Sequence, residues 1–124
     1  NAETAAQLVA NRAEKIQNTQ EDRQKKMDDF RVLTEKVQAI NYSLATMRKP
    51  ANEFTDEDRA KISMRFSELA IQLPPLIDEA EKIKTSAQRS QMSVLEQNAH
   101  SLQQSLVSLR QKLGGFKQDT GPLQ

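Results

Sequence analysis

The residues able to do nucleophilic or metal chemistry are few, and they centre on His100, the single imidazole of the chain. A hydroxyl nucleophile would need this imidazole as its base, and Ser101 and Ser105 lie near it only because the segment is rich in Ser. Glu96 lies four residues before His100, so the two would share a helix face and form half of a metal site. The other ligands would have to come from a partner chain, and we expect His100 to be an ordinary surface residue.

Carboxylates occur in clusters along the chain, and general acid-base catalysis would need two clusters to converge in a sheltered pocket. The clusters at Asp56 to Asp58 and at Asp78 to Glu81 both lie where a helix starts or restarts, and negative charge is favourable there for the helix dipole. The sequence has no Cys, no Gly-rich phosphate loop, no nucleophile elbow and no zinc-ligand spacing. We therefore expect no enzyme, no bound metal and no cofactor.

The charge of the chain is nearly balanced, with 18 Lys or Arg residues against 17 Asp or Glu residues and a net charge of +1. Nucleic acids and anionic membranes attract a local excess of Lys and Arg, and no segment carries one. We therefore expect neither as a partner, and no apolar run approaches the length that a membrane span needs. The lack of Cys assigns no compartment, because helical proteins of several compartments dispense with it.

The first element that the sequence predicts is a long helix. No Gly or Pro occurs from Ala2 to Arg48. Larger apolar residues recur there at steps of three and four, at Met27, Phe30, Leu33, Val37, Ile40, Leu44 and Met47. This spacing predicts a helix over about 2–48, followed by a turn over 49–54, because Pro50 restricts the residue before it.

A second helix start lies at Thr55, whose hydroxyl is suited to an N-cap and is followed by three acidic residues. Asp58 occupies the capping-box position, where Glu or Gln is usual. Apolar residues then continue at heptad-like steps, at Ile62, Phe66, Leu69 and Leu73. The pattern predicts a helix over about 56–113 that must accommodate Pro74 and Pro75.

The two prolines leave two folds open. Either the helix bends at 73–75 and continues, giving a long, coiled-coil-like antiparallel helical hairpin, or the chain reverses at Pro74 and forms a three-helix bundle. We prefer the hairpin, because an antiparallel register about Asn52 pairs apolar residues on both sides of the prolines. In that register Ile40 faces Ile62 and Val37 faces Phe66.

The cleanest repeat is a leucine stripe beyond the prolines, consisting of Leu95, Ala99, Leu102, Leu106, Leu109 and Leu113. In the hairpin register most of this stripe extends past the first helix and has no mate within the chain. We therefore predict that it binds a partner through Leu95, Leu102, Leu106, Leu109 and Leu113. Gly114 and Gly115 are typical of a helix end, so residues 1–113 form one helical domain and residues 114–124 a flexible tail.

The segment from 85 to 108 is rich in Ser and Gln and carries few ionisable groups, which is unusual for an exposed helix. Two interpretations remain open. The segment is either a solvated helix or a face packed against another helix, where amides and hydroxyls are tolerated better than charges.

These observations lead to two hypotheses about function. The first is a non-enzymatic module for protein-protein interaction and assembly, in which a coiled-coil surface pairs with another copy, as a homo-oligomer, or with another helical protein. The alternative is an extracytoplasmic helical-bundle domain that senses a ligand for a membrane receptor, since a hairpin places both termini at one end. A first residue of Asn1 indicates processing or excision from a longer protein.

Overall fold

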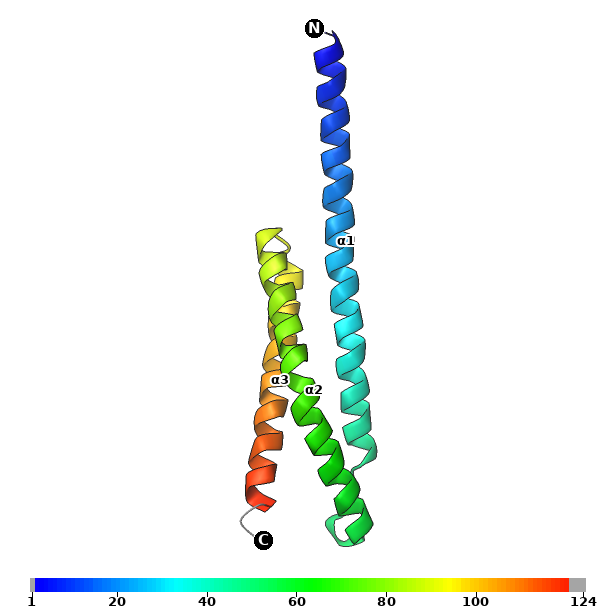
Figure 1. Ribbon diagram of the computed structural model, residues 1–124, viewed down its shortest axis with the longest axis vertical. Helices are drawn as coiled ribbons and strands as arrows, with labels where there is room; N and C mark the ends of the chain where they lie inside the picture. The colour runs from blue at the N-terminus through cyan, green and yellow to red at the C-terminus, as the bar shows by residue number, and fades with distance from the viewer. Residues whose placement is uncertain (1, 121–124) are drawn as a thin grey trace.

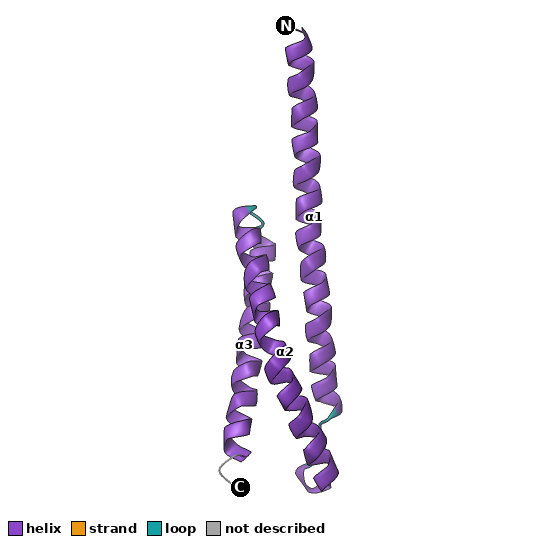
Figure 2. Cartoon of the chain, in the orientation of Figure 1, coloured by secondary structure: helices purple, strands orange, loops and turns teal. Residues whose placement is uncertain are grey.

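The fold is built from three long helices. The computed structural model describes the backbone of residues 2–120 and the side chains of residues 4–114. Within this range the elements are α1 (Ala2–Thr46), the short 3-10 helix η1 (Ala51–Glu53), α2 (Asp56–Arg89) and α3 (Ser93–Thr120), and no strand is present. Figure 2 shows the short loops that join them. The predicted all-α fold class is confirmed.

The end of α1 agrees with the sequence to within two residues. The helix ends at Thr46, and the amides of Met47 and Arg48 still donate to carbonyls three residues earlier, at 3.2 and 3.3 Å. Pro50 then adopts extended backbone angles, with φ −56° and ψ 143°, and cannot continue the helix. The chain crosses to α2 through η1.

The start of α2 is fixed by the predicted capping box. The Asp58 amide donates to the Thr55 hydroxyl at 3.0 Å, and the Thr55 amide donates to the Asp58 carboxylate at 3.1 Å. Lys49 adds an ion pair to the same carboxylate at 3.0 Å. The Thr55 backbone hydrogen bond, followed by the one from Lys49, lowers the pKa of Asp58.

The helix α2 continues through Pro74 and Pro75. The sequence pattern predicted this continuation in the hairpin fold that it favoured. The prolines offer no N–H to the carbonyls of Ala70 and Ile71, so two rungs of the helical hydrogen-bond ladder are missing. Figure 1 shows the first half of α2 leaning away from α3, while its second half lies along α3. The missing rungs give a physical reason for this change in direction.

The chain reverses at residues 90–92, so the predicted single helix over 56–113 is wrong. Gln91 has φ 57°, in the left-handed region. Its amide donates to the Gln88 carbonyl at 3.1 Å, and the Met92 amide donates to the Ala87 carbonyl at 2.9 Å. This pair of bonds is the Schellman helix end, which turns the chain back sharply. The structure therefore has the three helices of the alternative fold, but with the reversal after the prolines rather than at them.

The C-terminal boundary also differs from the expectation. The backbone of α3 continues to Thr120 and passes through Gly114 and Gly115, so the predicted helix end there is wrong. Glycine lowers helix stability but does not forbid helical backbone angles. Of the predicted tail over 114–124, residues 121–124 lie outside the described residues.

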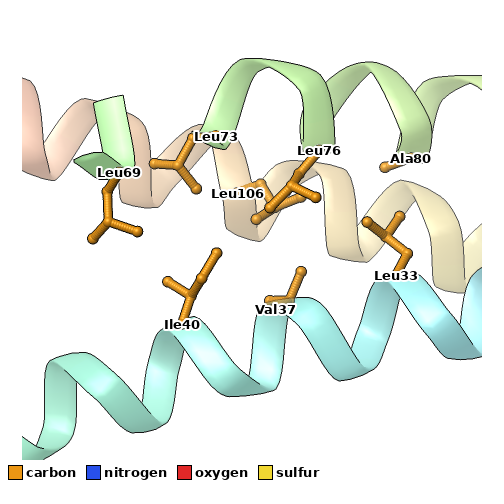
Figure 3. Close-up of a cluster of buried hydrophobic side chains, with 8 residues drawn as sticks. All are labelled: Leu33, Val37, Ile40, Leu69, Leu73, Leu76, Ala80 and Leu106. Atoms are coloured by element: carbon orange, nitrogen blue, oxygen red, sulfur yellow. The ribbon is translucent and has the colours of Figure 1, made fainter. Parts of the chain in front are cut away.

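The core lies where the three helices meet. Its buried members are drawn in Figure 3 and are Leu33, Val37, Ile40, Leu69, Leu73, Leu76, Ala80 and Leu106. Among the described side chains, Leu106 is the buried member of this cluster that comes from α3, and it is 1% exposed. Leu69, Leu73 and Ala80 are completely buried. Burial of these apolar side chains provides the main driving force for association of the helices.

The register between α1 and α2 differs from the predicted one. Figure 3 shows Ile40 opposite Leu73 rather than Ile62, and Val37 opposite Leu76 rather than Phe66. The linker explains the shift, because it carries the chain past the end of α1 before α2 turns back (Figure 1). As a result, the first turns of α2 extend beyond α1.

The first half of α1 projects past the turn between α2 and α3 (Figure 1). Every described residue from 4 to 25 is exposed. The start of α1 and the end of α3 lie at opposite ends of the molecule. This differs from the hairpin expectation, in which the two termini lie at one end. No helix within the described residues has the length and hydropathy to cross a bilayer.

Candidate partner-binding groove

The leucine stripe packs against the core of its own chain. Leu95 is 7% exposed and Leu106 is 1% exposed. The other predicted partner-binding residues, Leu102, Leu109 and Leu113, are partly buried and pack against the core. The expectation that the stripe has no internal mate is therefore wrong, because the turn at 90–92 folds α3 back onto α2.

Small residues are buried on both α2 and α3. Ala80 and Ala87 of α2 and Ala99 of α3 are all completely buried. The side-chain amide of Gln103 donates to the Glu81 carboxylate across the two helices at 2.6 Å. Hydrogen bonds from Lys84 and then Gln103 lower the pKa of Glu81. Part of the Ser- and Gln-rich segment over 85–108 is thus a packed face. The helix that this face of α3 contacts is α2 of the same chain.

Three polar contacts among the described residues join α1 to α2 or to Ser90, which follows α2. Lys26 donates to the Ser90 hydroxyl at 2.9 Å, and Arg65 donates to the Ser43 hydroxyl at 3.1 Å. An ion pair of 3.8 Å joins Lys36 and Glu79. The Lys26 and Arg65 contacts lie towards the two ends of the core, and the Lys36 ion pair lies between them.

A groove of about 1210 Å³ lies at the end where α2 leans away from α3. We call it the apolar groove. It is lined by the end of α1, the linker after it, the first half of α2 and the end of α3. Its large apolar side chains are Leu44, Met47, Phe54, Ile62, Phe66, Leu73 and Leu113. Apart from Leu73, which is completely buried, these side chains are half-buried and so still expose apolar surface.

The face that α2 presents to the groove follows helical spacing, at Arg59, Ile62, Ser63, Phe66, Ser67, Ala70 and Leu73. At about 1.5 Å of rise per residue, this face is about 21 Å long. A helix of about 14 residues, or four turns, has the same length. The α2 wall of the groove is therefore as long as one further helix of four turns.

The shift in register created the groove. Ile62 and Phe66 were expected to pack on Ile40 and Val37. In the structure, Leu73 and Leu76 face these two α1 residues instead. Ile62 and Phe66 therefore line the groove instead. The sequence pattern therefore identified Ile62 and Phe66 as apolar positions of the helix, but the contacts predicted for them were wrong.

The residues first considered for chemistry do not converge. His100 is exposed on α3, and Glu96 lies one turn earlier on the same helix. No group of three or more His, Cys, Asp or Glu residues in the described part of the chain is placed to hold a metal ion. The carboxylates at Asp56 and Asp58 are engaged with Arg59 and Lys49.

No protein-family model, curated protein or solved structure matches this chain.

Proposed function

We propose that this chain is a non-enzymatic module for protein-protein interaction that receives a helix of another molecule in the apolar groove. One observation carries the proposal: three helices leave a groove with half-buried apolar walls where a fourth helix would fit. A helix seated there would remove Ile62, Phe66 and Leu113 from water, and burial of apolar surface contributes roughly 25 cal/mol per Å². The result would be a four-helix arrangement.

The partner helix belongs either to a second copy of the chain or to another protein. Self-association remains part of this proposal, although its expected surface has changed from the leucine stripe to the groove. The sensor alternative has lost its geometric support, since α1 begins and α3 ends at opposite ends of the molecule.

The test uses a neutral helical peptide of about 14 residues, matched to the groove by its rise per residue. Its apolar face is Leu at steps of three and four, and its polar face is Gln and Ser. Amide NMR spectra of the protein are recorded as the peptide is added. We expect shifts at Phe54, Ala70 and Leu113 and none at Thr19, which lies on the free half of α1.

Two matched variants complete the test. Ile62→Asp places a charge in the groove and should abolish binding, because the carboxylate would lose its water on complex formation. Ile71→Asp puts the same charge on the same helix at a residue that is 77% exposed and outside the groove, so binding should persist. Equal binding by both variants would refute the groove as the site. Light scattering of both variants at several concentrations tests whether a second copy is the partner, since only Ile62→Asp should then be monomeric.

A further inference from the structure

The charged residues that line the apolar groove all have the same sign. They are Arg48, Lys49, Arg59 and Arg110, and no carboxylate among the side chains that the structure describes, residues 4–114, lines the groove. The chain as a whole has almost equal numbers of acidic and basic residues. The positive lining is therefore a local property of the groove.

Two of these cations are already paired within the chain. Lys49 contacts Asp58 at 3.0 Å, and Arg59 contacts Asp56 at 3.7 Å. Arg48 and Arg110 have no carboxylate within ion-pair distance among the described residues. Both residues are exposed, with Arg48 following α1 and Arg110 on α3. Among the described residues, the groove thus has a guanidinium without a carboxylate partner on each of two separate walls.

From this arrangement we infer that the groove selects an acidic amphipathic helix of another protein, with an apolar stripe flanked by Asp or Glu on both sides. This inference rests on the proposed function and adds the chemistry of the partner. The apolar stripe would lie on Ile62, Phe66 and Leu113, and the flanking carboxylates would reach Arg48 and Arg110. Guanidinium groups bind carboxylates through paired hydrogen bonds, which gives orientation as well as attraction.

The size of the groove favours a helix over a small amphiphilic molecule. Its volume of about 1210 Å³ is larger than the roughly 300–1000 Å³ typical of small-molecule pockets. Its walls are helices, so the ridges of a fourth helix can pack between their side chains.

The free half of α1 from a second copy is a poor occupant. Ile16 is the largest apolar residue on the face that continues the core-facing positions of α1, and it is 60% exposed. Arg12 and Arg23 lie on that same face, four residues before Ile16 and seven after it. Docking this face in the groove would bring those side chains towards Arg48 and Arg110, and the like charges would repel.

The experiment compares two fluorescent peptides of equal length with identical Leu stripes, one flanked by Glu and one by Lys. Binding to the full chain is measured by fluorescence anisotropy at low salt. We expect the Glu peptide to bind at least about tenfold more tightly, because each charge pair at an exposed rim contributes a few-fold in affinity. The difference should collapse in about 1 M salt, where the screening length is about 3 Å.

The double variant Arg48→Glu with Arg110→Glu should reverse the preference. Both side chains are exposed, so helicity should be unchanged, and circular dichroism verifies this. Arg31→Glu with Arg89→Glu is the matched control, because it makes the same change in charge at exposed residues outside the groove. The control should keep the preference for the Glu peptide.

The remaining outcomes separate the two proposals. If both peptides bind equally and the double variant changes nothing, the charge inference is overturned while the groove still binds helices. If neither peptide binds, and the neutral peptide also fails, both proposals are overturned. If the peptides fail and the chain associates with itself through the groove, the occupant is a second copy and the acidic-partner inference is overturned.

Discussion

Replacing Leu106 with Ala tests whether the leucine stripe belongs to the core of the chain or to an interface. Leu106 is 1% exposed and is the member of the core cluster that α3 contributes. Leu to Ala changes at such sites cost about 2–5 kcal/mol of unfolding free energy, from lost burial and from the cavity that remains. A chain of this size has about 5–15 kcal/mol in total, so the loss is a large fraction of its stability.

The assay is urea denaturation followed by circular dichroism at several protein concentrations. With an m-value of about 2 kcal/mol per molar urea, a loss of 3 kcal/mol lowers the midpoint by about 1.5 M. Leu8→Ala is the matched control, because Leu8 lies on the free half of α1 and is 54% exposed. Its effect should stay within about 0.5 kcal/mol. If Leu106→Ala leaves the midpoint unchanged and dissociates an oligomer instead, the stripe is an interface and the packing described above is refuted.

Two further predictions concern the helix ends. Gln91→Gly should raise the unfolding free energy by about 1 kcal/mol, because a non-glycine residue with φ 57° bears a steric cost that glycine avoids; an unchanged or lower urea midpoint would contradict the left-handed turn. The lowered pKa of Asp58 means that its carboxylate stabilises the folded chain at neutral pH and loses this effect as the pH falls below about 4. The stability difference between the natural chain and Asp58→Asn, measured by urea denaturation, should therefore shrink towards zero on acidification, and a constant difference would contradict the ion pair and capping box.

The helices were predictable where local signals decide the structure. The absence of Gly and Pro before Pro50 set the extent of α1, and Thr55 with Asp58 set the start of α2. The turn at 90–92 was missed because its left-handed position is occupied by Gln91 rather than by Gly or Asn, the residues that normally mark such a turn. There the packing of α3 on α2 outweighs a weak local preference.

The groove could not be predicted because hydrophobic periodicity does not fix register. Phe66 and Leu76 both lie on the repeating apolar positions of α2, so either one satisfies the pattern as a mate for Val37. The geometry of the linker makes the choice, and it depends on the three-dimensional path from Met47 to Thr55. The basic lining of the groove also draws on residues far apart in the sequence, such as Arg48 and Arg110.

The short turn at 90–92 has a consequence for the order in which the chain folds. It brings α2 and α3 together through a very small loop, whereas α1 joins them through the longer segment from Met47 to Thr55. Closing a short loop loses less chain entropy, so contacts between α2 and α3 can form while α1 is still unattached. We therefore expect Ala99→Gly in α3 to slow folding and Val37→Ala in α1 mainly to speed unfolding, and stopped-flow kinetics would show the reverse if α1 and α2 paired first.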